Sequence, residues 1–419
     1  MTEIQLAYGT TAVGFSFDAA RYQVLTPNQV DQTPLSDLEI GETFDNPIDC
    51  RPLDELFSSG DSVLIVVSDA TRATASAQVI NLLVRRLIAV GVSPADLAII
   101  FATGLHRPVT EAEKRVLLTP FIAQRIKTLD HDPNDASNMV VIGETQRGTP
   151  VELNRALRDY SRVVITGAIG FHYFAGFTGG RKSICPGLAS ARTIKATHML
   201  ALDFETGKRR VGVDTALMQG NAVHEECELI ASMIAPSLGI NAVVDEQGRA
   251  VRVYSGHWRE SHAIGCREYL IEHSVSIDAR REVVIVSCGG SPYDLNLIQA
   301  HKALEMASHA CVDGGDIILL SECVDGLGRS DFLKWFEIGD SADLASHLRS
   351  AYEVNGQTAW SLLSKAERFH VHLVSTLPDE TVRRMHMIPS RSLAEALMKT
   401  DHARGYVMPR GAAVLPRLN

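Results

Sequence analysis

Short polar motifs stand directly after several apolar runs of the sequence, and their residue types can do acid–base or anion-binding chemistry. The segment SDATR (residues 68–72) follows the first strong apolar run, and Arg72 offers a planar guanidinium suited to a carboxylate or phosphate. The segment ATGLHRP (residues 102–108) follows the next run and carries His106, a residue type suited to acid–base catalysis. Taken alone, a helix cap at Ser68 or Asp69, a solvated Arg and a surface His explain these motifs equally well.

The densest polar motif is GFHYFAGFTGGRKSICPG, residues 170–187. Its clustered glycines let the backbone approach an anion, and we expect Arg181, Lys182 and Ser183 to complete a phosphate cradle. The motif departs from a P-loop because Arg181 separates Gly180 from the lysine, which argues against nucleotide hydrolysis. His198 follows downstream, and a single histidine holds a metal only when a cofactor brings further ligands.

A fourth motif, CGGSPYDLN (residues 288–296), lies in the second half of the chain and leads into a predicted helix. Gln299 and Lys302 are three residues apart on that helix, so they share a face and can both reach a ligand. Without the other motifs, a solvated helix face would explain them.

The elements that must position these motifs alternate between strand and helix. Apolar, β-branched runs predict buried strands at residues 62–68, 97–102, 139–143 and 162–166, and a second series at 282–290, 316–321 and 370–375. Helical spacing appears at 75–92, 297–310 and 342–352. This alternation predicts an α/β protein of two domains, 1–275 and 276–419, with mainly parallel sheets and an interdomain active-site cleft. Residues 241–270 predict a hairpin followed by a helix, and the last residues predict a strand that returns to either domain.

Composition narrows the class of partner. Of 419 residues, 45% are hydrophobic and 21% charged, the net charge is −10, and the basic residues are scattered. We therefore expect a small-molecule substrate and neither a nucleic acid nor a membrane as partner. The start lacks the features of a secretory signal and no run approaches a membrane span, so we expect a cytoplasmic protein. The 7 cysteines include no CxxC pair and predict no disulfide framework.

Taken together, the three motifs around SDATR, ATGLHRP and GFHYFAGFTGGRKSICPG, the trailing His198 and the segment GGSPYDLNLIQAHK resemble the ordered signature of the nickel-pincer lactate racemase family. The resemblance runs from about residue 44 to 330 and is weaker beyond. It implies two α/β domains around a nickel-pincer nucleotide, a pyridinium bis-thiocarboxylate mononucleotide whose ring carbon and two sulfurs bind nickel. The first domain would bind the cofactor and carry catalysis, and the second would close over the site.

The resemblance also implies a role for each matching residue. His198 would be the protein ligand to nickel, and Lys182 would hold the pincer, in some members through a covalent thioamide. The other cofactor-binding positions would be Asp69, Ala70, Thr71 and Arg72. His106 and His172 would be the paired acid and base catalysts. The substrate would be bound by Arg72, Gln299 and Lys302.

These roles imply an isomerase, a 2-hydroxy acid racemase or epimerase. The α-proton beside a carboxylate is very weakly acidic, so reversible hydride removal to the cofactor, with a histidine taking the hydroxyl proton, avoids a carbanion. The proposed intermediate is a flat 2-oxo acid that can regain hydride on either face. Separate cofactor-synthesis proteins would be partners, and a homodimer is compatible with the sequence.

The pocket wall departs from the lactate-specific pattern. Ala70 stands where the lactate enzyme has His, and Ser291 and Ile298 each replace a Tyr. Gln357 aligns with a Trp near the pincer, with Trp360 one turn along. These changes favour a longer substrate such as malate or an aldonate. Three alternatives stay open: an aldonate 2-epimerase with the same chemistry, a non-catalytic protein that binds the nickel cofactor or phosphate, and a P-loop-like nucleotide hydrolase.

Overall fold

The computed structural model describes residues 2–28, 31–400 and 404–419, which form two compact units. The N-terminal unit comprises Val30–Ala201 and Arg210–Leu270. The C-terminal unit comprises Met1–Gln29, Leu202–Arg209 and Ile271–Asn419. The chain therefore enters the C-terminal unit close to residue 275, but the first strands and the segment Leu202–Arg209, which the sequence analysis assigned to the first domain, belong to the C-terminal unit as well.

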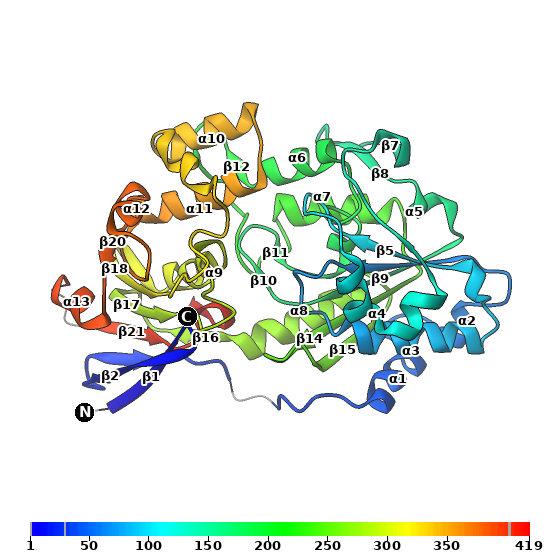
Figure 1. Cartoon of the computed structure of the whole chain (residues 1–419), viewed down its shortest axis with the longest axis horizontal. Coiled ribbons are helices and arrows are strands. Elements are labelled where there is room, and N and C mark those ends of the chain that lie inside the picture. Colours follow the sequence, from blue (N-terminus) through cyan, green and yellow to red (C-terminus); the bar gives the residue numbers. More distant parts are fainter. Residues whose placement is uncertain (1, 29–30, 401–403) are drawn as a thin grey trace. The chain divides into compact units, whose positions relative to one another are not determined.

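The N-terminal unit is built on a six-stranded sheet in the order β15-β14-β9-β4-β5-β6, parallel except for the β14–β15 hairpin (Figure 1). Its strands are β4 (Val63–Ser68), β5 (Leu97–Ala102), β6 (Lys127–Leu129), β9 (Arg162–Ala168), β14 (Leu238–Val244) and β15 (Ala250–Gly256). Its helices are α1 (Asp37–Asp45), α2 (Leu53–Leu56), α3 (Ser76–Ala89), α4 (Glu111–Arg125), α5 (Ala156–Asp159), α6 (Ala191–Met199), α7 (Ala222–Ser232) and α8 (Glu260–His273).

Alternation along the central strand explains why this sheet is buried on both faces. In β4, Ile65 packs into a core with α1, α3 and α4, while Leu64 and Val66 face a second core with α5, α6 and α7. Successive strand residues point to opposite faces, so a strand covered on both sides must be apolar throughout. The predicted strands at 62–68, 97–102 and 162–166, the hairpin and the helix after it are confirmed.

One strand that was predicted to be buried forms on the surface instead. Residues 139–143 do form a strand, β7 (Met139–Glu144), but it pairs antiparallel with β8 (Pro150–Asn154) in a separate two-stranded sheet. Val141 in this strand is 74% exposed. A short β-branched run has the same composition in a surface hairpin as in a central strand, and neighbouring context decides between them.

The C-terminal unit repeats the architecture with a parallel sheet in the order β20-β19-β18-β17-β21-β3. These strands are β3 (Tyr22–Val24), β17 (Arg281–Ser287), β18 (Cys311–Leu320), β19 (His370–Val374), β20 (Ile388–Ser390) and β21 (Gly405–Met408). Shorter pairs are β1 (Thr2–Tyr8) with β2 (Thr11–Phe17), β12 (Leu202–Asp203) with β13 (Lys208–Arg209), and β16 (Ser274–Ile277) with β22 (Leu415–Leu418). The helices are α9 (Leu297–Ser308), α10 (Ser341–Ser350), α11 (Val354–Arg368), α12 (Asp379–Arg384) and α13 (Leu393–Met398).

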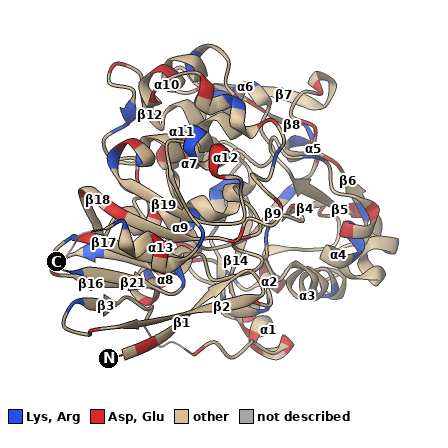
Figure 2. Cartoon of the chain, turned by 60° about the vertical axis from the view of Figure 1, so that its left-hand side comes forward, with Lys and Arg blue, Asp and Glu red and all other residues tan. Residues whose placement is uncertain are grey.

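Both sheets bear out the predicted α/β class with mainly parallel strands. The final strand β22 returns to the C-terminal unit, where it runs parallel to β16. Basic and acidic residues are interspersed along the elements of each unit (Figure 2). Within the described residues, no helix combines the length and the apolar character that crossing a bilayer requires.

Candidate active site

The ring of Phe174 is the centre of a cluster that unites three of the predicted site residues. His172 packs edge-on against it at 4.5 Å between ring centroids, and His198 does so at 5.2 Å. The Nζ of Lys182 lies 6.0 Å from the same ring centroid. His172 comes from the short strand β10 (Phe171–His172), Lys182 from the 3-10 turn at Gly180–Ser183, and His198 from the last turn of α6. The fold thus gathers residues that are up to 26 positions apart in the sequence.

Burial lowers the pKa values of the basic groups in this cluster and so favours their neutral forms. The pKa of His198 falls to about 3 because burial disfavours the imidazolium and Lys182 adds a repelling charge. Burial, helped by the charges of Arg181 and Arg72, holds the pKa of Lys182 well below its ordinary value. Burial and the nearby Lys182 act in the same way on the pKa of His172. A neutral imidazole can bind a metal, and a neutral amine is a nucleophile.

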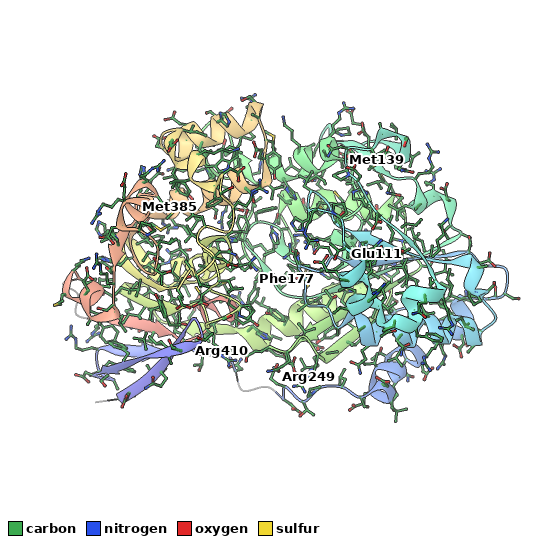
Figure 3. All side chains as sticks on the ribbon, in the orientation of Figure 1. Glu111, Met139, Phe177, Arg249, Met385 and Arg410 are labelled. Atoms are coloured by element: carbon green, nitrogen blue, oxygen red, sulfur yellow. The ribbon has the colours of Figure 1, made fainter. Side chains whose placement is uncertain are left out.

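The loop of residues 170–183, here the glycine-rich loop, is held by a buried arginine. Arg181 is 1% exposed, and its Nη2 donates hydrogen bonds to the carbonyl oxygens of Ala175 at 2.6 Å and Phe177 at 3.0 Å. The side chain of Phe177, labelled in Figure 3, is itself buried in β11 (Gly176–Phe177). Asn221, fully buried at the N-cap of α7, donates to the carbonyl oxygen of Phe174 at 3.0 Å.

The expected phosphate cradle is wrong in its donors, because the protein itself uses them. Arg181 is committed to the loop carbonyls, and Ser183 Oγ donates to the Thr166 carbonyl at 2.8 Å. The N–H of Gly180 donates to Asn241 Oδ1 at 2.8 Å. Gly179 has φ +77°, and a Cβ on it would lie 2.8 Å from the same Asn241 oxygen. The glycines therefore allow close packing of the loop against β14.

His106 lies in the turn after β5 and faces the end of β4. Its Nδ1 is 2.6 Å from Oδ2 of Asp69, which is 4% exposed. The other oxygen of Asp69 accepts from the N–H and the hydroxyl of Thr71 at 2.9 and 2.5 Å. Burial alone would raise the pKa of Asp69, but the hydrogen bonds from His106 and Thr71 hold it below its ordinary value. Asp69 therefore orders this turn and does not cap α3, whose N-cap is Ala75.

Ala70, Thr71 and Arg72 lie in the same turn and are exposed. Arg72 is close enough to Lys182 and His172 for its charge to lower the pKa of both. The turn after β4 thus lies near the Phe174 cluster, as the carboxyl ends of adjacent parallel strands require.

The predicted substrate residues of the C-terminal unit do share a helix face. On α9, Lys302 Nζ donates to Gln299 Oε1 at 2.8 Å, and both side chains are exposed. Gln357 on α11 is 2% exposed and accepts from the hydroxyl of Tyr352 at 2.7 Å. Trp360, one turn along, donates from Nε1 to the Gly207 carbonyl at 3.2 Å.

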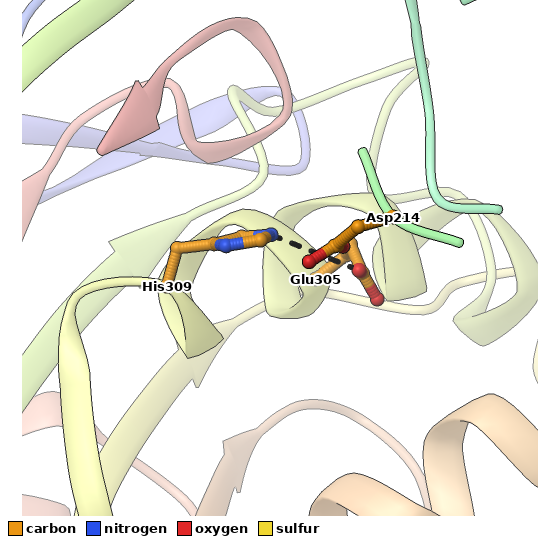
Figure 4. A group of neighbouring side chains, drawn as sticks. All are labelled: Asp214, Glu305 and His309. Atoms are coloured by element: carbon orange, nitrogen blue, oxygen red, sulfur yellow. Dashed lines mark ion pairs between the residues drawn. The ribbon is translucent and has the colours of Figure 1, made fainter. Parts of the chain in front are cut away.

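Sequence reasoning missed a buried ion-pair cluster on the same helix α9. Glu305 is 1% exposed and lies 2.8 Å from Arg209 and 2.5 Å from Lys365. His309 follows one turn later, 3.8 Å from Glu305 (Figure 4). Burial alone would raise the pKa of Glu305, but Arg209 and Lys365 hold it well below its ordinary value. This cluster fastens the segment Leu202–Arg209 to the C-terminal unit. Because Arg209, Glu305 and Lys365 are far apart in the sequence, no local pattern predicts that they form a cluster.

Known proteins resemble both halves of the chain. Residues 8–208 match the family model described as the lactate racemase N-terminal domain, and residues 277–415 match that of the lactate racemase C-terminal domain. Lactate racemases of Thermoanaerobacterium thermosaccharolyticum and Lactiplantibacillus plantarum are each 29% identical, covering 100% and 99% of this chain and 100% of their own.

Solved structures agree with these matches. The apoprotein of the T. thermosaccharolyticum lactate racemase has a TM-score of 0.89 at 28% identity and covers 99% of this chain and 100% of its own. A Thermotoga maritima protein at 20% identity shares the fold, with a TM-score of 0.68 over 93% of this chain and 100% of its own. The chain therefore belongs to the lactate racemase family of isomerases.

Proposed function

We propose that the protein is a 2-hydroxy acid racemase or epimerase that works with a nickel-pincer nucleotide and uses His106 and His172 as its acid–base residues. The observation that carries the proposal is the cluster around Phe174, which gathers His172, Lys182 and His198 within reach of Arg72. Family membership supports the racemase chemistry. The cluster supports the cofactor and the residue roles.

The donor set fits the cofactor. Nickel requires a neutral imidazole, which His198 offers because of its lowered pKa. A thioamide bond to the pincer requires a neutral amine, and the lowered pKa of Lys182 favours that form. When bound, the nickel-pincer nucleotide supplies a hydride acceptor for the α-carbon of the substrate.

The residues of the chain have distinct tasks in this proposal. The guanidinium of Arg72 binds the substrate carboxylate through its planar fork. The Nε2 of His106, whose ring is held by Asp69, takes up and returns the hydroxyl proton. His172, which packs against Phe174, is the second proposed acid–base residue. Gln299 and Lys302 are proposed substrate-binding residues of the C-terminal unit.

The test is to co-express the chain with the cofactor-synthesis proteins, measure its mass and nickel content, and assay the same sample on chiral lactate, malate and aldonates. Near-stoichiometric nickel with inversion of one acid establishes the function and identifies the substrate. Inversion of an aldonate and no shorter acid would assign the 2-epimerase. Absence of nickel, with a lactate racemase loaded in parallel, would refute the cofactor assignment. Nickel without turnover of any acid would favour a carrier.

A further inference from the structure

The two histidines proposed for acid–base catalysis differ in what their Nδ1 atoms contact. The Nδ1 of His106 faces a carboxylate oxygen of Asp69 at 2.6 Å. The Nδ1 of His172 faces two backbone N–H groups, those of Ala175 at 3.2 Å and Phe174 at 3.5 Å. Neutral imidazole carries one proton on either nitrogen, and the partner of one nitrogen decides where that proton lies.

For His106 the partner is an obligate acceptor. The lowered pKa of Asp69 keeps it ionised, and its second oxygen already accepts two hydrogen bonds from Thr71. A carboxylate can only accept, so Nδ1 of His106 must carry the proton. The Nε2 of the neutral ring then has a free lone pair.

For His172 the partners are obligate donors. A backbone N–H cannot accept, so Nδ1 of His172 must be unprotonated and the neutral ring carries its proton on Nε2. The peptide that supplies the closer N–H is fixed at its other end, because Asn221 Nδ2 donates to the Phe174 carbonyl oxygen at 3.0 Å. Arg181 fixes the next peptide by donating to the Ala175 carbonyl oxygen at 2.6 Å. Turning this segment away from His172 would break both bonds.

We propose that Asp69 and the Phe174–Ala175 peptide preset His106 and His172 in opposite tautomers, so that Nε2 of His106 is a proton acceptor and Nε2 of His172 is a hydrogen-bond donor. This deepens the proposed function and rests on it. The hydroxyl group of a 2-hydroxy acid can donate its proton and can accept a hydrogen bond at its oxygen. The two neutral histidines can do both, with His106 accepting the proton and His172 donating a hydrogen bond. Asp69 is then a positioning residue that acts through His106, and Asn221 is one that acts through His172.

The proposal makes the two histidines inequivalent in the resting protein. His106 can accept a proton at Nε2 directly, because its Nδ1 proton stays in the hydrogen bond to Asp69. For His172 to accept at Nε2, its proton must first move to Nδ1, which displaces the N–H of Ala175. Proton uptake in the resting protein is therefore assigned to His106.

The test reads the tautomers by two-bond proton–nitrogen NMR of the full chain with ¹⁵N-labelled histidine, without cofactor, at neutral pH. His106→Gln and His172→Gln assign the two sets of signals. We expect a protonated Nδ1 in His106 and a protonated Nε2 in His172. The same tautomer in both rings would overturn the proposal.

Substitutions test the role of Asp69 at His106 separately from the role of Asn221 at His172. Asp69→Asn removes the obligate acceptor, so His106 should lose its single tautomer while His172 keeps its own. Asn221→Ala should make His172 lose its single tautomer while His106 keeps its own. The matched control is Asp135→Asn, because Asp135 makes the same bonds to the N–H and hydroxyl of Ser137 two residues on, with no histidine among its hydrogen-bond partners in the described residues. It should leave both rings unchanged.

A second measurement distinguishes the positioning role of Asp69 from the proposed racemase function. In co-expressed protein, Asp69→Asn should keep its nickel content and lose turnover by about 10²–10⁴-fold, the usual contribution of a positioned acid–base group. Loss of nickel together with turnover would assign Asp69 to the cofactor and contradict the positioning role. If the two histidines have opposite tautomers but the nickel-loaded protein turns over no 2-hydroxy acid, the tautomer proposal holds and the proposed function is refuted.

Discussion

Replacement of Arg181 by Met tests whether a buried cation maintains the glycine-rich loop. The guanidinium of Arg181 is 1% exposed and gives two hydrogen bonds to the carbonyls of Ala175 and Phe177. Each bond from a charged group contributes about 1.5–3 kcal/mol, and relief of the buried charge offsets part of their loss. We therefore expect a net cost of about 2 kcal/mol, which for a unit of this size lowers the unfolding midpoint by about 4–8 °C.

The measurement is thermal unfolding of the cofactor-free chain, with Arg249→Met as the control. The side chain of Arg249, labelled in Figure 3, is 58% exposed and pairs with Asp245 on the surface of the same unit. Surface pairs contribute about 0–1 kcal/mol, so the control should shift the midpoint by at most about 2–4 °C. Arg181→Lys keeps the charge but loses the planar fork, and should recover only part of the loss. Equal shifts for Arg181→Met and Arg249→Met would refute the role given to the buried guanidinium.

Three further predictions address other parts of the chain. Asn221→Ala removes the N-cap of α7 and the bond to the Phe174 carbonyl, and should lower the free energy of unfolding by about 3 kcal/mol in urea; a change below about 0.5 kcal/mol would contradict this. Glu305→Gln should cost about 3–5 kcal/mol at neutral pH because Arg209 loses its buried partner. The folded pKa of Glu305 is lowered, so its stabilisation is present above its unfolded pKa of about 4.3 and is lost as the pH falls through the folded pKa. The urea midpoints of wild type and Glu305→Gln should therefore become more similar as the pH is lowered. A difference between the two midpoints that stays constant with pH would count against the ion pair. Lys182→Met should leave the unfolding midpoint at or above wild type, because a buried amine is replaced by an apolar chain, and mass spectrometry of co-expressed protein should show no covalently attached cofactor; retention of the added mass would exclude Lys182 as the attachment point.

The sequence predicted the fold where burial dictates residue type. Residues 62–68 and 162–166 must be apolar throughout because both faces of their strands are covered, and both runs lie in the central sheet. The run at 139–143 has the same composition but forms a surface hairpin, because nothing local distinguishes the two settings. The assignment of Leu202–Arg209 to the C-terminal unit depends on contacts such as Arg209 with Glu305, which are 96 positions apart.

Several of the predicted site residues lie close together in the structure, but the sequence did not indicate the hydrogen bonds among them. Loop positions after strands indicated His106 and the 170–187 motif, which contains Lys182, and the family resemblance added the roles of Lys182 and His198. Phe174, which joins them, has the composition of a core residue and gives no signal of its own. The phosphate-cradle prediction failed because glycines that admit an anion and glycines that admit Asn241 look alike in sequence.

The charges around Phe174 favour a defined order of events in this site. Besides burial, Arg72 and Arg181 contribute to the lowered pKa of Lys182 and of His172, so their positive charges favour the neutral forms of both bases. The same charges attract a carboxylate or a phosphate, whose negative charge then raises both pKa values again. In the proposed function, the amine of Lys182 is therefore a better nucleophile before an anion binds than afterwards. The ring of His106 is held instead by Asp69, whose Oδ2 lies 2.6 Å from its Nδ1.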